Sequence, residues 1–157
     1  MAEHVLADLG SEVEFTLDGG PCRVGVESTI VDVSRGDPVI LRPGGVTKEA
    51  IEEALGRAVP VLHASEVRVS GQLASHYAPK AEVVLVRPED LPSRVAELRT
   101  RGFRVETLEH PEAESLYAFL RAADGRGADM VVVVEPPQEG LGLAVGDRLR
   151  KAAAPRG

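Results

Sequence analysis

Two short segments of the chain combine a side chain that could bind a ligand with backbone that a ligand could approach. Ser28 lies in the run Gly-Val-Glu-Ser-Thr-Ile, and Arg42 ends an apolar run and precedes Pro-Gly-Gly. A buried serine hydroxyl without a hydrogen-bond partner costs about 1–3 kcal/mol. A guanidinium beyond a strand end can hold phosphate or carboxylate through two hydrogen bonds. From the pattern alone, both residues could serve a ligand or ordinary structural hydrogen bonds.

A third candidate is the pair His76-Tyr77, which lies between Ser75 and Ala78-Pro79. An imidazole and a phenol on a loop could close over a ligand as a lid, or they could pack against the face of a domain. The pattern identifies no catalytic residue. Cys22 has no adjacent histidine, and the four histidines are too scattered to indicate a metal site.

Composition excludes several classes of protein. The 157 residues are 43% hydrophobic and 27% charged, which is typical of a soluble globular protein. No apolar run approaches the ~18–20 residues of a membrane span, so no membrane partner is expected. The lack of a secretory signal and the single cysteine favour a reducing, cytoplasmic location. The net charge of −7 argues against a dominant nucleic-acid surface.

The first part of the chain must position Ser28 and Arg42 with few elements. Helical spacing of apolar residues and runs of β-branched residues are the main signals. The expected elements are a helix over 2–9, strands over 12–17, 23–33 and 38–42, a helix from the Thr47 cap to Leu55, and a short strand over 59–61. Because such a set buries little surface, we expect exposed apolar edges that a partner, a missing segment or self-association would cover.

The second part alternates strands with helices, which is typical of a parallel sheet. Strands are expected over 82–86, 103–108 and 130–134, and helices over 90–101, 112–124 and 141–153. The valine run from Val131 to Val134 favours a strand covered on both faces. We therefore predict an α/β protein that ends in a small Rossmann-like α/β/α domain.

The order of the motifs resembles the YrdC-type family of L-threonylcarbamoyladenylate synthases. The matching segments are 25–30 and 40–44 for the second half of the YrdC-type domain, 70–71 and 76–79 for the linker of the two-domain form, and 139–145 with 147–153 for the end of the C-terminal domain. The resemblance implies the C-terminal part of a YrdC-like catalytic domain over residues 1–62, an interdomain linker or lid over 63–80, and a C-terminal Rossmann-like domain over 81–157.

The resemblance also implies a nucleotidyltransferase reaction. Family members condense L-threonine, bicarbonate and ATP, with Mg2+, into threonylcarbamoyl-AMP and pyrophosphate, and the product serves the modification of an adenosine in tRNA. By motif position, Ser28 corresponds to a serine that contacts threonine, and Arg42 to an arginine that contacts ATP. His76 and Tyr77 fall in the linker that folds over the nucleotide. Binding of tRNA or double-stranded RNA is a further family implication, which the negative net charge does not support.

Three motifs of the family's earlier half are absent: a Lys-x-Arg pair, a Pro-Thr-Glu-Thr stretch and a Ser-x-Asn motif. We therefore expect a C-terminal part of the enzyme that needs the missing N-terminal part to complete its cleft and has little or no activity alone. The alternative is a noncatalytic α/β interaction or regulatory module that docks on a separate catalytic half. ATP binding that is lost in Arg42→Ala would favour the enzyme.

Overall fold

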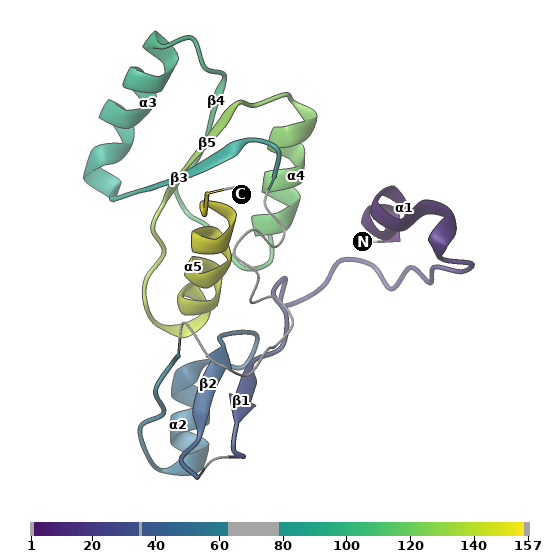
Figure 1. Cartoon of the computed structure of the whole chain (residues 1–157), viewed down its shortest axis with the longest axis vertical. Coiled ribbons are helices and arrows are strands. Elements are labelled where there is room, and N and C mark those ends of the chain that lie inside the picture. Colours follow the sequence, from purple (N-terminus) through teal and green to yellow (C-terminus); the bar gives the residue numbers. More distant parts are fainter. Residues whose placement is uncertain (1, 35, 63–78, 156–157) are drawn as a thin grey trace.

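The structure is a computed structural model that describes residues 2–34, 36–62 and 79–155. The C-terminal part is built on three strands, β3 (Glu82–Val86), β4 (Val105–Leu108) and β5 (Met130–Val134). They form a parallel sheet with the order β3-β5-β4 (Figure 1). All residues of β5 are buried because this strand has a neighbour on each side and helices on both faces.

Three helices flank the sheet: α3 (Leu91–Thr100), α4 (Leu116–Gly125) and α5 (Gly140–Ala152). The apolar side chains of α3 pack against Met130, Val132 and Val134. Those of α4 and α5 pack on the opposite face, against Val131 and Val133. Successive side chains of a strand point to opposite faces, so the valine run serves both layers. The expected α/β class, with a parallel sheet between helical layers, is confirmed.

The first part of the chain contains α1 (Ala2–Leu9), the 3-10 turn η1 (Gly10–Glu12), β1 (Ile30–Asp32), β2 (Val39–Arg42) and α2 (Lys48–Leu55); a second 3-10 turn, η2 (Pro88–Asp90), precedes α3. β1 and β2 form an antiparallel pair. The Thr47 side chain accepts a hydrogen bond from the Ala50 N–H at the start of α2, and Gly56 ends the helix with φ at 65°. Both ends of this helix are as predicted.

Three of the predicted strands in this part need correction, and the short one over residues 59–61 is only an isolated bridge between Val61 and Ile40. The strand over residues 12–17 is wrong: the segment is not a strand, and Phe15 and Leu17 are 85% and 96% exposed. An alternating pattern holds a strand only where a partner strand and a packing surface exist. The strand over residues 23–33 forms only as β1. Gly25 interrupts the extended backbone with φ at 73°, a left-handed conformation.

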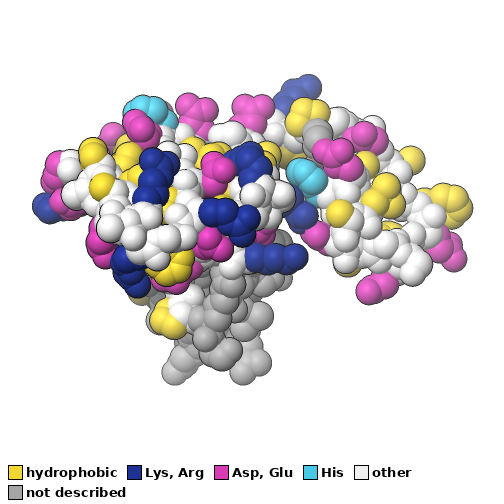
Figure 2. Space-filling view, turned by 90° about the horizontal axis from the view of Figure 1, so that it is seen from above, with side chains coloured by type: hydrophobic (Ala, Val, Ile, Leu, Met, Phe, Trp, Pro, Cys, Tyr) yellow, Lys and Arg dark blue, Asp and Glu magenta, His cyan; other side chains and the backbone are white. Residues whose placement is uncertain are grey.

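Exposed apolar residues gather in the first part, as expected. Among the described residues, every large exposed hydrophobic side chain except Leu141 lies before residue 63. They are Val5, Leu6, Leu9, Phe15, Leu17, Val24, Val33, Val46, Leu55 and Leu62. α1 buries none of its residues, and Figure 2 shows apolar side chains on the surface at the α1 end of the molecule, at the right of the view. We call these residues the N-terminal apolar surface.

Candidate functional site

Ser28 and Arg42 lie in contact, although they come from different segments. The pairing of β1 with β2 sets Ile30 opposite Arg42, which brings the residues just before β1 beside the end of β2. The Nε and Nη2 atoms of Arg42 donate to the Ser28 carbonyl oxygen at 3.1 and 2.9 Å, and Nη2 also donates to the Ser28 hydroxyl oxygen at 3.2 Å. Arg42 is 7% exposed. The structure thus joins the two candidate residues, and the guanidinium has a clear structural task.

Two glycines after Arg42 allow the segments of the two candidate residues to pack closely. The Gly45 N–H donates to the Glu27 carbonyl oxygen at 2.9 Å. A Cβ atom on Gly44 would lie 2.3 Å from that same oxygen and 2.4 Å from the Thr29 backbone nitrogen. The Val46 N–H donates to the Thr29 hydroxyl at 3.1 Å. The glycine turn therefore serves backbone packing that a larger residue would prevent.

Glu27 directs its carboxylate toward the C-terminal domain. Arg148 of α5 donates from Nε to Glu27 Oε2 at 2.8 Å and from Nη1 to the Pro43 carbonyl oxygen at 2.7 Å. The Tyr117 hydroxyl of α4 lies 3.3 Å from Glu27 Oε1 and donates to it. Arg148 is 6% exposed. A buried cation from one end of the chain therefore holds the residues next to Ser28 and Arg42.

The charges in this network perturb one another. Burial alone would raise the pKa of Glu27, but hydrogen bonds from its own backbone and from Arg148, with the charges of Arg148 and Arg42, lower it overall. Burial, followed by the Glu27 charge, raises the pKa of Tyr117 well above its ordinary value. Burial opposes the charge on Arg148, but the Glu27 carboxylate outweighs it and raises the pKa of the guanidinium. Glu27 and Arg148 are therefore both ionised at neutral pH.

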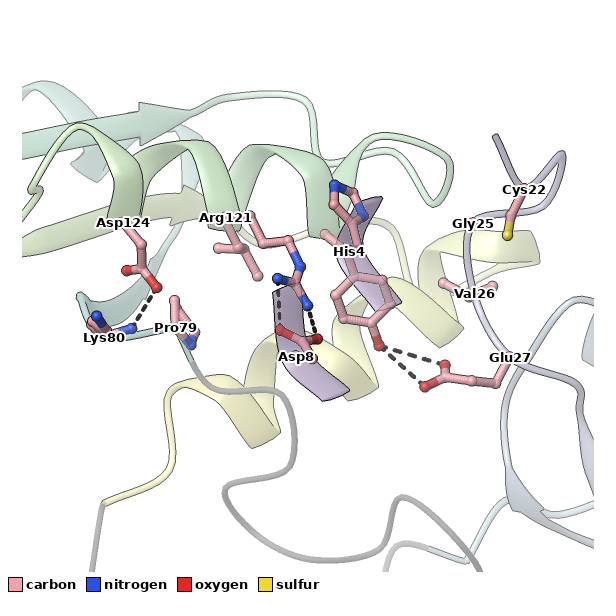
Figure 3. Close-up of a pocket in the computed structure, with 12 residues that line it drawn as sticks. His4, Asp8, Cys22, Gly25, Val26, Glu27, Pro79, Lys80, Arg121 and Asp124 are labelled. Carbon is pink, nitrogen blue, oxygen red and sulfur yellow. Dashed lines mark hydrogen bonds and ion pairs between the residues drawn. The ribbon is translucent and has the colours of Figure 1, made fainter. Parts of the chain in front are cut away.

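A hollow of about 740 Å³ lies between α1, residues 22–27 and α4 (Figure 3). Asp8 of α1 pairs with Arg121 of α4 along it. Asp124 accepts hydrogen bonds from the N–H groups of Lys80 and Ala81 at 2.8 and 3.0 Å. These contacts join α1 and the start of β3 to the same helix, so the charged lining of the hollow is largely occupied by contacts within the protein.

The described residues contain no cluster of metal-binding side chains. No group of three or more His, Cys, Asp or Glu residues among them could hold a metal ion. In the same part of the chain, no helix is long and apolar enough to cross a membrane. Cys22 is exposed and lines the hollow. His76 and Tyr77, with residues 63–78 of the predicted linker, lie outside the described residues.

Protein-family models match both parts of the chain. A model described as the C-terminal domain of threonylcarbamoyl-AMP synthase matches residues 46–154, and a Sua5/YciO/YrdC model described as telomere recombination matches residues 1–44. The chain belongs to the threonylcarbamoyl-AMP synthase family. Membership confirms the resemblance that the motifs indicated.

The relatives that match nearly the whole chain are about twice as long as it is. The threonylcarbamoyl-AMP synthase of Pyrococcus abyssi is 36% identical over 99% of this chain and 54% of its own length. A crystal structure of P. abyssi Sua5 complexed with L-threonine superimposes with a TM-score of 0.86 at 32% identity, covering 97% of this chain and 53% of that one. A P. abyssi Sua5 variant with alanines at a consecutive histidine and tyrosine gives 0.82 at 30% identity, covering 97% and 52%. The chain spans about half the length of these relatives.

The contact of Glu27 with Arg148 was not predicted from the sequence. The two residues are 121 positions apart, and periodicity carries no signal for such a pair. Tyr117 lies in the predicted helix over residues 112–124, and helical periodicity does not indicate that its hydroxyl reaches Glu27. One signal was available, because Glu27 and Arg148 both lie inside segments that resemble the threonylcarbamoyl-AMP synthase family.

Proposed function

We propose that the chain forms the C-terminal portion of a threonylcarbamoyl-AMP synthase. The whole enzyme would condense L-threonine, bicarbonate and ATP into threonylcarbamoyl-AMP and pyrophosphate, and the product would serve tRNA modification in the cytoplasm. Family membership across nearly the whole chain supports this activity. Because the chain spans about half the length of its relatives, the reaction would need both halves, and the chain alone would have little or no synthase activity.

Ser28 is proposed to contact L-threonine, and Arg42 to contact ATP. The observation that carries the proposal is the contact between them: a hydroxyl and a guanidinium from separate segments lie 3.2 Å apart. Nucleotidyl transfer depends mainly on holding the reactants together and on neutralising phosphate charge. A guanidinium beside a hydroxyl can do both, since the hydroxyl can orient the amino acid where the cation attracts the triphosphate. The threonine complex of P. abyssi Sua5 supports threonine as the amino acid.

His76 and Tyr77 are proposed to fold over the nucleotide as part of the linker. One comparison supports this role: the P. abyssi variant has alanines at a consecutive histidine and tyrosine, and this sequence contains such a pair once, at positions 76 and 77. An aromatic ring and an imidazole can stack on a purine and donate hydrogen bonds to phosphate. We keep the proposed division into residues 1–62, the linker 63–80 and residues 81–157.

Two contacts support the first boundary of that division. The Ile40 N–H donates to the Pro60 carbonyl oxygen, and the Leu62 N–H donates to the Ile40 carbonyl oxygen, each at 2.9 Å. The chain up to residue 62 is therefore bound to β2. At the other side, the linker ends where Asp124 of α4 binds the N–H groups of Lys80 and Ala81.

Magnesium is proposed to enter with ATP. The described residues offer no cluster of three or more acidic, histidine or cysteine side chains for it. Mg2+ commonly keeps several waters and binds substrate phosphates. A resident metal site in the described part of this chain therefore does not fit, and we assign no step to the ion.

The N-terminal apolar surface is proposed to pack against the other half of the enzyme. α1 buries none of its residues, although Leu6 and Leu9 are large and apolar. Clusters of exposed apolar side chains mark interaction sites in soluble proteins. The unmatched half of the relatives is the polypeptide that would cover this surface.

A chimera tests the proposed function. The N-terminal half of the P. abyssi synthase that this chain does not match would be fused ahead of residue 1, and pyrophosphate release would be measured with ATP, L-threonine and bicarbonate. We expect activity from the chimera and not from the chain alone. Arg42→Ala should abolish it, whereas Arg57→Ala should not, because Arg57 is exposed and pairs with Asp37. Full activity of the Arg42→Ala chimera would contradict the assignment.

The noncatalytic module is the second candidate, and two further binding measurements distinguish it. It predicts saturable association of the chain with the separate N-terminal half but no contribution of Arg42 to ATP binding. Titrating ATP into the chimera and into its Arg42→Ala variant decides between the two. Equal ATP affinity in both would favour the noncatalytic module.

A further inference from the structure

Arg148 contacts the sequence neighbours of Ser28 and Arg42, two of the residues that we propose to bind substrate. Its Nε atom donates to Glu27 Oε2 at 2.8 Å, and Glu27 directly precedes Ser28. Its Nη1 atom donates to the Pro43 carbonyl oxygen at 2.7 Å, and Pro43 directly follows Arg42. One side chain of the C-terminal domain therefore joins both substrate segments.

The Arg148 side chain is itself held on α5. Asp147 accepts hydrogen bonds from Arg148 Nη1 at 2.9 Å and from Lys151 Nζ at 2.6 Å. Leu149, the next residue, is fully buried in the core beneath the helix. A guanidinium is planar and its donors point in fixed directions. An anchored Arg148 therefore sets where its two acceptors must lie.

The segment that precedes the candidate serine has further contacts with the C-terminal domain. Val26 packs against the core that α4 and α5 form with the sheet. The Tyr117 hydroxyl donates to Glu27. Gly25 lies so close to the backbone before α4 that a Cβ atom on it would be 2.1 Å from the Ala113 carbonyl oxygen. Through these contacts, the C-terminal domain holds residues 25–27 in position before Ser28.

We propose that Arg148 is a positioning residue for the substrate site and acts through Glu27 and Pro43. The inference rests on the proposed function, because it takes Ser28 and Arg42 as substrate-binding residues. Without the Arg148 side chain, the Glu27 carboxylate keeps only the Tyr117 hydroxyl as a side-chain donor among the described residues, the Pro43 carbonyl loses the donor that Arg148 supplies, and the two segments lose their common anchor. A misplacement of reacting or binding groups by about 1 Å can lower a rate about a hundredfold. Displaced segments would move Ser28 and Arg42 away from their substrates, so the binding of both substrates should weaken.

Amide hydrogen exchange in the 157-residue chain tests the structural part of this inference. Arg148→Met keeps a long side chain and removes the charge and the donors. We expect amides in residues 25–30 and 43–46 to exchange about tenfold faster, while those of β5 keep wild-type rates. Unchanged exchange in both segments would overturn the proposal. If the β5 amides also exchange faster, the variant has lost global stability, and Glu27→Gln takes its place with the same readout.

Arg126→Met is the matched control. Arg126 donates to both carboxylate oxygens of Glu106 at 2.8 and 3.1 Å on the same domain, and it is 51% exposed in its side chain. Its loss removes an ion pair of the same kind that touches neither substrate segment. Amide exchange in residues 25–30 should therefore stay at the wild-type rate in this variant. Faster exchange there would mean that the Arg148→Met result reflects general destabilisation and not the loss of the Arg148 contacts.

Kinetics of the chimera test the functional part. Arg148→Met should raise the KM for L-threonine and for ATP by about tenfold each, because the segments that carry Ser28 and Arg42 lose charge-assisted hydrogen bonds to a common anchor. Arg148→Lys, which keeps the charge but not the planar donors, should lie between that variant and wild type. Unchanged KM values in an active Arg148→Met chimera would overturn the proposal. An inactive wild-type chimera would instead count against the proposed function, and the exchange experiment would still decide whether Arg148 holds the segments.

Discussion

The Arg148 guanidinium and the Glu27 carboxylate, 121 positions apart in the chain, form an ion pair with Nη2 2.7 Å from Oε2. The two side chains are 6% and 28% exposed. Ion pairs removed from water are stable only when further hydrogen bonds satisfy their remaining atoms. Pro43 and Asp147 accept such bonds from Arg148, and Tyr117 donates one to Glu27.

Under the proposed function, this pair would give the C-terminal domain a role in placing the substrate segments. The sheet and its helices form a complete core of their own, which α5 shares through Val145 and Leu149. Arg148 projects from that rigid helix toward the segments of Ser28 and Arg42. A site held by residues on regular elements is more precise than one held by loops alone. The domain therefore contributes stiffness to two loops that β1 and β2 hold only in part.

Glu27→Gln should reduce the acid sensitivity of the fold. The pKa of Glu27 lies below its unfolded value of 4.5, so its stabilising effect is complete above that value and is lost as pH falls through the lower folded pKa. At pH 7 the variant should be less stable by about 2 kcal/mol, because Arg148 loses a charged acceptor. Urea unfolding between pH 3 and pH 7 measures both effects.

The control is the difference in the free energy of unfolding between wild type and Glu27→Gln, followed across the same pH range. The difference in the free energy of unfolding should be largest near pH 7 and shrink as pH falls below 4.5, since protonated Glu27 resembles glutamine. Acid sensitivity from other ion-paired carboxylates, such as Glu52 with Lys48, is common to both proteins. A difference that stays constant down to pH 3 would show that the charge of Glu27 does not stabilise the fold.

Local sequence patterns predict the strands and helices of the C-terminal domain because each of these elements carries its own signal in a short segment. The valine run of β5 fits a covered central strand, and glycines such as Gly102 follow the helices they end, with Gly102 at φ 89°. The predicted strand over residues 12–17 does not form, because a strand there would depend on contacts outside the segment. Its alternation is genuine, but Phe15 and Leu17 have no packing surface among the described residues. Alternation predicts a strand only when the rest of a sheet is present.

The candidate site was predictable where the signal lay within one segment. Ser28 and Arg42 each stand out in a short motif, and both motifs lie in or beside segments that the sequence predicts as strands; their contact follows from the antiparallel pairing of those strands in the structure. The structural roles of Gly25 and Arg148 could not be predicted from any single segment. A positive φ at Gly25 and the reach of Arg148 to Pro43 depend on how two domains dock, and that information is spread over the whole chain.

Gly25→Ala should disturb the docking of the two parts. Gly25 has φ at 73°, and a Cβ atom would lie 2.1 Å from the Ala113 carbonyl oxygen and 2.3 Å from Glu114 Cα. Left-handed strain and overpacking together should lower the free energy of unfolding by about 2–4 kcal/mol. Gly19→Ala is the control, because nothing lies within 4 Å of a Cβ there and its φ is not positive. Urea unfolding that finds the two variants equally stable would contradict the close packing.

Ser28→Ala should separate threonine binding from ATP binding in the chimera. Arg42 donates to the Ser28 backbone as well as to its hydroxyl, so Arg42→Ala disturbs both substrates. Removing the hydroxyl alone leaves the bond from Arg42 to the Ser28 carbonyl oxygen in place. We expect the KM for L-threonine to rise about tenfold and that for ATP to change less than twofold.

Ser93→Ala serves as the control for that measurement. Its hydroxyl donates to the Asp90 carbonyl oxygen at the start of α3, in the C-terminal domain. Both KM values should therefore stay at wild type. A rise in the KM for ATP equal to that for threonine in Ser28→Ala would assign the serine to the general shape of the site, and unchanged values would remove it from the binding residues.

Leu6→Gln should weaken the whole enzyme without weakening the isolated chain. Leu6 is 53% exposed, so the substitution should change the free energy of unfolding of the chain by less than about 0.5 kcal/mol. In the chimera, the supplied N-terminal half would bury this side chain, and the same change should cost about 1–2 kcal/mol. Leu141→Gln is the matched control, since Leu141 is 37% exposed and lies outside the N-terminal apolar surface. Thermal and urea unfolding of the wild type and of both variants, each in the chain and in the chimera, measure the difference. An equal effect of Leu6→Gln in the chain and in the chimera would show that the N-terminal half does not cover α1.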